Sequence, residues 1–201
     1  FLNLNFKVGL ISTIENKIHT TSLTSTHTTP NSLEINRLLS LMLLEGCQFC
    51  FMEVSSHGIA QNRILGLDFD IAIFTNISRD HLDYHDSFND YVNTKKRFFD
   101  ILSEKVISIV NIDDPYSSTM LMDTRSKKML YGINSIAHYN ASILENTIHG
   151  LNLNINGQAV STKLIGDFNA YNLLATYSVA KELGIRDKVA LNSLSDLNPV
   201  P

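Results

Sequence analysis

The sequence predicts an α/β fold: a mostly parallel, wound sheet flanked by helices, with a small antiparallel β appendage. Three runs, FCFMEVS (49–55), IAIFTNI (71–77) and VISIVNI (106–112), are apolar throughout. Strands that are apolar on both faces are typical of parallel sheets covered by helices. A helical pattern at 87–102 lies between two of these runs, as in a β-α-β unit. Residues 137–166 instead alternate polar and apolar residues with Gly and Asn at the turns, which predicts an antiparallel meander.

The N-terminal elements follow from local signals. KVGLIST (7–13) has the composition of a strand. Residues 19–32 are polar and threonine-rich and contain a proline, which favours a loop. The pattern that follows predicts a helix with Ser32 as its N-cap and an end at Gly46, because Ser is a preferred N-cap and Gly a preferred helix stop.

The remaining elements follow in the same way. A short helix is expected after DDPYS (113–117), and KMLYG (128–132) is a further strand. Residues 167–184 form a well-marked helical pattern, for which Asp167 is the expected N-cap. A second short helix is expected after Arg186.

Composition limits the class of protein. The chain has 201 residues, 44% hydrophobic and 18% charged, with a formal net charge of −4. These values are typical of a globular protein, and the acidic balance argues against nonspecific nucleic-acid binding. No stretch approaches the ~20 apolar residues of a membrane span, and no signal peptide is visible. We therefore expect a cytoplasmic, monomeric protein that neither enters a membrane nor binds nucleic acid.

Two cysteines, Cys47 and Cys50, have the spacing of a redox or zinc pair. One pair does not complete a four-ligand zinc site, and Cys50 lies within an apolar strand pattern. The alternative interpretation is a pair of small, buried apolar side chains.

Ionisable and polar groups follow two of the predicted strands. MEVSSH ends with Glu53, Ser55 and His57, and TNISRDH contains Asn76 and His81. Ligands of open parallel sheets bind beyond the carboxyl ends of the strands. If the two strands are neighbours, Glu53 and His81 converge and could hold a hard or borderline cation. Alternatively, Glu53 faces solvent and His81 is a packed or capping residue.

The helix predicted at 87–102 contains a lysine in its apolar stripe. Lys95 lies between stripe positions, whereas Lys96 and Arg97 point elsewhere. The stripe consists of Phe88, Tyr91, Val92, Phe99 and Leu102. Such a lysine either extends to water or is partly buried, and burial favours the neutral, nucleophilic amine. A neutral amine reacts with carbon dioxide to form a carbamate.

HLDYH (81–85) also suggests a metal-dependent hydrolase, because His81 and His85 are four residues apart. On a helix the two would share a face and could bind zinc. Several aspartates surround them, however, in a segment typical of a loop.

Five segments together resemble the Mur ligases, and within that family the MurE type. They are TTPNSLEINRLL, FMEVSSHGIAQNRILGLDFDIAIFTNISRDHLDYH, YVNTKKRFF, VNIDDP and LIGDFNAYNLLAT. The resemblance implies the central ATPase domain, of P-loop NTPase-like fold, of a three-domain enzyme. Residues 1–198 would form this domain without its phosphate loop, which should precede KVGLIST by one helix. Residues 199–201 would begin the linker to a C-terminal domain.

The resemblance also implies roles for individual residues. Glu53, His81 and Lys95 would be catalytic: Glu53 and His81 as ligands of Mg²⁺, and Lys95 as a carbamate that also serves the metal. Substrate-binding positions would be Thr28, Thr29, Ser55, Gln61 and Arg63. Cofactor-binding positions would be Asn76, Asn169 and Asn172, with Asn169 and Asn172 near the adenine of ATP.

The implied reaction is ATP-driven amide formation in peptidoglycan synthesis. UDP-N-acetylmuramoyl-L-Ala-D-Glu would be activated as an acyl phosphate and joined to a diamino acid, either meso-diaminopimelate or L-lysine. Two anions meet in the first step, so cations must offset their repulsion. The alternatives are a folylpolyglutamate-synthase-like ligase, the metal-dependent hydrolase, and a domain that binds ligand without catalysis.

Overall fold

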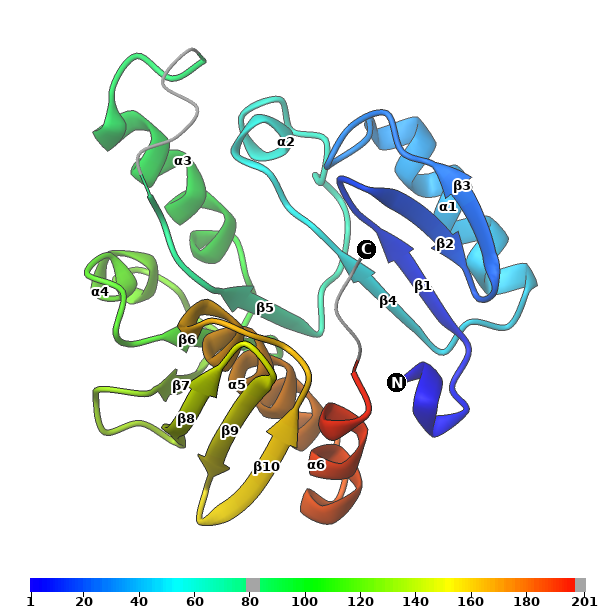
Figure 1. Ribbon diagram of the computed structural model, residues 1–201. Coiled ribbons are helices and arrows are strands. Elements are labelled where there is room, and N and C mark those ends of the chain that lie inside the picture. Colours follow the sequence, from blue (N-terminus) through cyan, green and yellow to red (C-terminus); the bar gives the residue numbers. More distant parts are fainter. Residues whose placement is uncertain (79–83, 198–201) are drawn as a thin grey trace. The chain divides into compact units, whose positions relative to one another are not determined.

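The computed structural model describes residues 1–78 and 84–197. The chain divides into two compact units, each of which contains its own sheet (Figure 1). The first unit comprises Phe1–Asp68 and Asp80–Phe98, and the second comprises Phe69–Arg79 and Phe99–Pro201.

The first unit contains a four-stranded sheet in the order β3-β2-β1-β4. Strands β1 and β4 are parallel, and the other two pairs are antiparallel. The elements are a short 3-10 helix at Leu2–Leu4, β1 (Val8–Ile11), β2 (Glu15–Ile18), β3 (Thr21–Thr24), α1 (Ser32–Leu44), β4 (Phe49–Met52), α2 (Ser56–Ala60) and α3 (Phe88–Asp100). Helix α3 continues two residues into the second unit.

The core of the first unit lies between α1 and the sheet. It is built from Ile11, Ile18, Ile35, Leu38 and Met42, each at most 8% exposed. Burial of an aliphatic side chain of this size stabilises the fold by about 1.5–3 kcal/mol. Gly9 of β1 permits the close approach of α1, because a Cβ at this position would overlap the sulfur of Met42.

The second unit contains a six-stranded sheet in the order β10-β9-β8-β7-β6-β5. Strands β5 to β8 are parallel, and β8 to β10 form an antiparallel meander. The elements are β5 (Ile71–Phe74), β6 (Ile107–Asn111), α4 (Ser117–Leu121), β7 (Lys127–Gly132), β8 (Tyr139–Thr147), β9 (Gly150–Ile155), β10 (Gln158–Thr162), α5 (Asp167–Glu182) and α6 (Asp187–Ser195). The predicted parallel sheet with an antiparallel appendage is confirmed.

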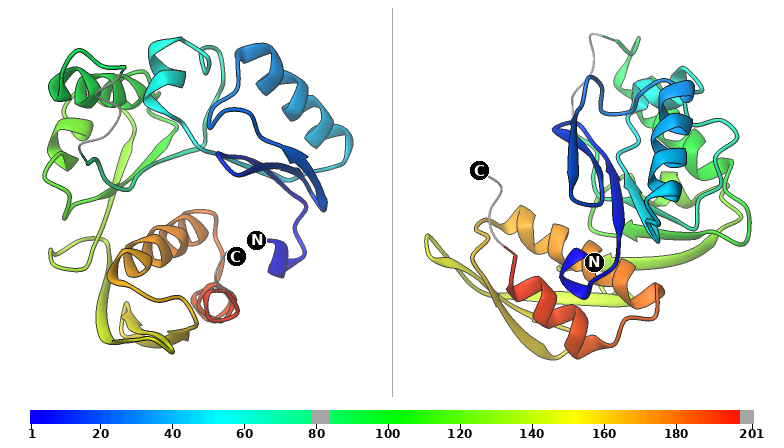
Figure 2. Two further views of the ribbon diagram at one scale, coloured as in Figure 1. Left: turned by 45° about the horizontal axis from the view of Figure 1, so that its top comes forward. Right: turned by 90° about the vertical axis from the view of Figure 1, so that its right-hand side faces the viewer.

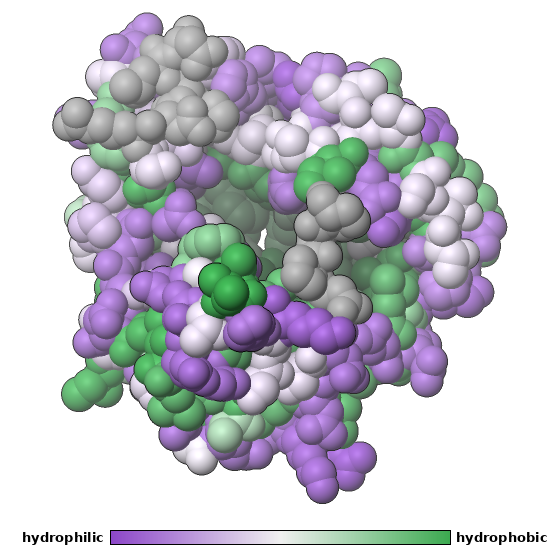
Figure 3. Space-filling view, in the orientation of Figure 1, coloured by the Kyte–Doolittle hydropathy of each residue, from purple (hydrophilic) through white to green (hydrophobic). Residues whose placement is uncertain are grey.

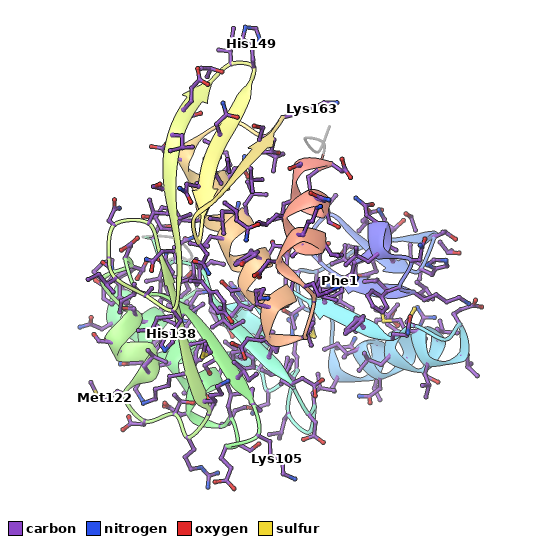
Figure 4. The ribbon with its side chains drawn as sticks, turned by 90° about the horizontal axis from the view of Figure 1, so that it is seen from below. Phe1, Lys105, Met122, His138, His149 and Lys163 are labelled. Carbon is purple, nitrogen blue, oxygen red and sulfur yellow. The ribbon has the colours of Figure 1, made fainter. Side chains whose placement is uncertain are left out.

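Helix α5 packs against β6, β7 and β8, and α6 packs against α5 and β10 (Figure 2). Leu173 and Leu174 of α5 are at most 2% exposed, as are Leu151, Leu153 and Ile155 of β9. The β8–β9 turn projects from this sheet, with His149 at its tip (Figure 4). The α5 helix thus has its buried face on the sheet, and its first turn follows the end of the meander.

Apolar and polar residues are interspersed on the face shown in Figure 3, and helix α1 also carries exposed apolar side chains. Leu33, Leu43 and Leu44 of this helix are each more than 75% exposed. Among the described residues, no helix is both long enough and apolar enough to cross a membrane. Cys47 and Cys50 are free thiols: Cys47 is partly buried against the core of the first unit, whereas Cys50 is exposed, so its expected burial was wrong.

Three local expectations were wrong. The segment expected as a loop at 19–32 contains β3, which pairs with β2 as a hairpin. β3 is mostly exposed, so it lacks the apolar alternation that reveals a half-buried strand, although its threonines are β-branched and suit an edge strand.

The other two concern helix starts. Asn31, not Ser32, caps α1, since its side chain accepts the Glu34 N–H at 2.9 Å. Gly166 occupies the N-cap position of α5, and the carboxylate of Asp167 instead accepts the Asn146 amide at 2.8 Å. In both cases the helix boundary differs by one residue from the one expected.

Candidate functional site

Glu53 follows β4 directly, and its carboxylate is fixed from the neighbouring strand. Because β1 and β4 are parallel, with Ile11 opposite Met52, Thr13 lies beside Glu53 at the carboxyl end of the sheet. Oε2 of Glu53 accepts the Thr13 N–H at 3.1 Å and the Thr13 hydroxyl at 2.5 Å. The Thr28 hydroxyl is hydrogen-bonded to that of Thr13 at 3.0 Å. Glu53 is exposed, and no described residue bonds Oε1, so this oxygen is available to a ligand.

Thr29 connects the loop before α1 to the end of β4. It is completely buried, and its hydroxyl donates to the Glu53 carbonyl at 2.8 Å and accepts the Ser55 N–H at 2.9 Å. Gly58 is required here, since a Cβ would lie 2.6 Å from Cγ2 of Thr29. In this geometry Thr29 holds Glu53 and Ser55 in place. Its expected direct contact with substrate stays a prediction.

Ser55, Gln61 and Arg63 surround the short helix α2. The Ser55 hydroxyl caps α2 by accepting the Gly58 N–H at 3.1 Å. The Arg63 guanidinium donates to Oε1 of Gln61 at 2.6 and 3.0 Å and to the Thr29 carbonyl at 2.6 Å. No carboxylate of the described residues pairs with Arg63, so its charge is available to an anionic ligand. The expected substrate-binding residues of the first unit therefore form one hydrogen-bonded network.

Tyr84 and His85 join this network, although neither was assigned a role in the ligase site. The Tyr84 ring lies 3.8 Å from that of His57, and its hydroxyl accepts the Gln61 side-chain amide at 3.1 Å. His85 is 5% exposed, and its ring nitrogens lie 2.9 Å from the Ser56 hydroxyl and 3.1 Å from the Asp90 carboxylate. Ser56 is 1% exposed, so this Ser-His-Asp chain fastens α2 to α3 rather than presenting a nucleophile.

The zinc hypothesis for HLDYH finds no support in these contacts. His85 is engaged by Ser56 and Asp90, and His81 lies outside the described residues. Within residues 1–78 and 84–197 no group of three or more His, Cys, Asp or Glu is arranged to bind a metal. The sequence did contain a signal for this structural role of His85. Asp90 follows it by five residues near the start of a helix, where a carboxylate is well placed to accept a hydrogen bond from a preceding imidazole.

Lys95 lies partly buried on α3, which is one of the two outcomes that the stripe left open. Tyr91, Val92, Phe99 and Leu102 are at most 5% exposed, and Phe88 is half-buried. Nζ of Lys95 lies 5.4 Å from the centre of the Tyr91 ring. Burial lowers the pKa of the Lys95 amine, which favours the neutral form that carbamate formation requires. Its orientation toward a metal-binding cleft stays a prediction.

The condition for a shared cation site, that the two strands pair with each other, is not met among the described residues. Among the described residues β4 pairs with β1, and β5 pairs with β6, so the strands before Glu53 and His81 belong to separate hydrogen-bonded sheets. Strand adjacency therefore no longer supports a joint cation site. Because His81 lies outside the described residues, the shared site stays a prediction.

In the second unit, Asn76 and the Asn169–Asn172 pair lie on different elements. Asn76 is exposed after β5, and the carboxylate of Asp114 fixes the next residue by accepting the Ile77 N–H at 3.0 Å. Asn169 and Asn172 lie on the first turns of α5, and their side chains are 3.4 Å apart. The two residues therefore share one helix face, and their role near the adenine stays a prediction.

Comparisons with known proteins cover nearly the whole chain. Residues 2–180 match a family model described as the Mur ligase middle domain. A UDP-N-acetylmuramoyl-L-alanyl-D-glutamate–2,6-diaminopimelate ligase of Bacteroides thetaiotaomicron is 44% identical over 200 residues, which cover 100% of this chain and 42% of that protein. The chain thus spans less than half the length of this curated relative.

Solved structures show the same fold. The structure of a UDP-N-acetylmuramoyl-L-alanyl-D-glutamate–2,6-diaminopimelate ligase matches with a TM-score of 0.86 and 28% identity, covering 100% of this chain and 42% of that one. The MurF ligase of Thermotoga maritima in complex with ADP matches with a TM-score of 0.67 and 17% identity, covering 100% and 44%. The second similarity concerns the fold alone.

Proposed function

Because the chain belongs to the Mur ligase family, we propose that it is the central domain of an ATP-dependent peptidoglycan ligase. The full-length protein joins a diamino acid to UDP-N-acetylmuramoyl-L-Ala-D-Glu. We take 2,6-diaminopimelate as that amino acid, since the relatives that are 42–44% identical carry it in their names. Residues 1–198 make up the central domain.

The chemistry is carboxylate activation followed by aminolysis. The terminal carboxylate of the dipeptide attacks the γ-phosphorus of ATP, which forms an acyl phosphate and releases ADP. The amine of the diamino acid then attacks the acyl carbon, phosphate leaves, and the nitrogen loses a proton. The first step brings two anions together, so groups that offset negative charge account for much of the catalysis.

The network of the first unit is the observation that carries this function. Among the described residues, it combines the Glu53 carboxylate, whose Oε1 accepts no hydrogen bond, with the Arg63 guanidinium, which has no carboxylate partner. The resemblance assigns metal binding to the first and substrate binding to the second. Thr29 holds both residues. Its hydroxyl donates a hydrogen bond to the Glu53 carbonyl, and its own carbonyl accepts one from the Arg63 guanidinium.

One carboxylate among the described residues suits a divalent cation. Oε2 of Glu53 is fixed by Thr13, no described residue bonds Oε1, and carboxylate oxygens suit Mg²⁺. Glu53, His81 and carbamylated Lys95 would hold Mg²⁺, which when bound supplies positive charge to the phosphates. Lys95 supports this role through its partial burial, which favours the neutral amine.

The proposed ATP-binding residues belong to the second unit. Asn169 and Asn172 present amide groups on one face of α5, and amides can bond both the donor and the acceptor groups of adenine. Asn76 is the third member of this set. Because ATP and nucleotide-linked precursors are intracellular, we place the full-length protein in the cytoplasm, and we propose that it acts as a monomer.

The test is phosphate release by the purified full-length protein. We expect release that requires ATP, Mg²⁺, UDP-N-acetylmuramoyl-L-Ala-D-Glu and diaminopimelate together, with mass spectrometry showing the tripeptide product. Lysine in place of diaminopimelate should give much slower release. Turnover with a folate and glutamate would instead establish the folylpolyglutamate alternative, and ligand binding without turnover would establish a non-catalytic domain.

A further inference from the structure

The Asp113 carboxylate accepts three hydrogen bonds, two from the β7–β8 loop and one from α5. It follows β6, and its Oδ2 accepts the Ile133 N–H at 2.7 Å, the Asn134 N–H at 2.9 Å and the Tyr171 hydroxyl at 3.0 Å. Burial raises the pKa of this carboxyl, but hydrogen bonds from Asn134, Ser135, Ile133 and Tyr171 outweigh it, so the pKa lies below its ordinary value. Asp113 is therefore a charged acceptor that joins the end of β6, the β7–β8 loop and α5.

The Tyr171 hydroxyl is fully used in this cluster. It donates to Asp113 and accepts the side-chain amide of Asn134 at 3.0 Å. Burial, followed by the hydrogen bond to Asp113, raises the pKa of Tyr171 to about 12, so the hydroxyl remains a donor at neutral pH. A phenol with both a charged acceptor and a donor is fixed more firmly than a surface tyrosine.

Tyr171 lies between the two asparagines that the proposed function places near adenine. Asn169 and Asn172 flank it on the first turns of α5, and Asn169 also donates to the Ile165 carbonyl at 2.8 Å. On the loop before α5, the Gly166 N–H donates to the side-chain oxygen of Asn146, a residue of β8, at 3.1 Å. The start of α5 is thus tied to the meander through Asn146 and to β6 through Tyr171 and Asp113.

We propose that Asp113 is a positioning residue for the nucleotide: through Tyr171 it holds the first turns of α5, so that Asn169 and Asn172 are ordered before the ligand arrives. Ordering these amides in advance removes part of the entropic cost of binding. This role rests on the proposed function, because it requires that Asn169 and Asn172 bind the nucleotide.

The same helix offers a matched control. The Tyr177 hydroxyl donates to the Asp187 carboxylate at 2.9 Å, so it makes the same kind of bond nearly two turns further along α5. That bond joins α5 to α6 and lies away from the first turn. Tyr171→Phe and Tyr177→Phe each remove one phenol–carboxylate hydrogen bond, but only the first releases the turn that carries the asparagines.

The experiment measures dissociation constants for Mg·ATP and for UDP-N-acetylmuramoyl-dipeptide by calorimetry, using full-length wild type, Tyr171→Phe, Asp113→Asn and Tyr177→Phe. Melting temperatures show how far each variant is destabilised. We expect Tyr171→Phe and Asp113→Asn to weaken ATP binding about tenfold, the change that loss of a hydrogen bond to a charged group produces. Dipeptide binding should stay at the wild-type value, and Tyr177→Phe should bind ATP as wild type does.

Three outcomes overturn the role of Asp113. Tyr171→Phe could bind ATP as tightly as wild type, or Tyr177→Phe could lose as much ATP affinity, which would indicate general destabilisation. A wild-type protein that binds no ATP would refute the proposed function itself, and with it this role. Combining Tyr171→Phe with Asp113→Asn should weaken ATP binding no further than the stronger single variant, because both remove the same tie.

Discussion

At the scale of single residues, the Arg63 guanidinium has an unusual set of partners. It donates to the Gln61 amide oxygen and the Thr29 carbonyl, both of which are neutral. Neutral acceptors do not offset the positive charge of the guanidinium. A planar guanidinium in this state is well suited to bind a carboxylate or phosphate. Arg37 of α1 is the opposite case, because it is exposed and paired with Glu34 at 2.7 Å.

We expect Arg63→Ala in the full-length ligase to weaken binding of UDP-muramoyl-dipeptide by about 1.5–3 kcal/mol, the range for a lost hydrogen bond to a charged group. ATP binding should change far less. Equilibrium titration with each ligand measures both, and Arg37→Ala is the control that should leave both affinities unchanged. Equal losses of the two affinities in Arg63→Ala would show that the side chain supports the fold rather than the substrate.

Lys95 gives the second prediction at this scale. Lys95→Ala should lower kcat by about 10²- to 10³-fold, as removal of one group that stabilises transition-state charge commonly does. Added formate or acetate should restore part of the rate, because a carboxylate can replace the oxygens of the missing carbamate. Lys96→Ala, one position away on α3, should keep wild-type activity. A Lys95→Ala enzyme with normal activity, or one that no carboxylate rescues, contradicts the carbamate.

The sequence predicted these residues unequally. The position of Lys95 in an apolar stripe was visible, because helical period alone places it beside Tyr91 and Phe99. The use of Thr29 as an internal tie was not visible, since its partners Glu53 and Ser55 are more than twenty residues away. Asp113 and Tyr171, 58 residues apart, were missed for the same reason.

At the scale of elements, the exact start of a helix depends on side-chain contacts and cannot be read from the residue type of a candidate N-cap alone. Asn31 and Ser32 are both good N-cap residues, and the structure selects Asn31, whose backbone is extended and whose side chain meets the Glu34 N–H. The short helix α2 was missed entirely, because its five residues show no apolar period. The β2–β3 hairpin was missed because β3 is mostly exposed.

The cap of α1 is directly testable. Asn31→Ala should lower the free energy of unfolding by about 1 kcal/mol, since the Glu34 N–H loses its acceptor. Ser32→Ala should change it by less than about 0.5 kcal/mol, as expected for an exposed position without such a contact. Urea titration measures both, and hydrogen exchange at the Glu34 amide localises the effect. A larger loss from Ser32→Ala would restore Ser32 as the cap.

At the scale of the whole molecule, the sequence predicted the fold class but not how the strands divide between sheets. The runs at 49–55 and 71–77 are both largely apolar, and nothing local indicates that β4 pairs with β1 while β5 pairs with β6. Strand pairing is decided by partners far apart in the chain. The proposed site residues are divided in the same way, with Arg63 in the first unit and Asn172 in the second.

This division gives the last prediction. If the first unit binds the UDP-muramoyl-dipeptide and the second binds the adenine, Arg63→Ala and Asn172→Ala should act on different ligands. We expect Asn172→Ala to raise the dissociation constant for ATP and leave that for the dipeptide unchanged, and Arg63→Ala to do the reverse. In the double variant, measured with each ligand alone, each loss should equal that of the single variant within about 0.5 kcal/mol, because independent sites are additive. A double variant that loses more affinity for either ligand would mean that the two units bind cooperatively, and a single variant that weakens both ligands equally would refute the assignment of one ligand to each unit.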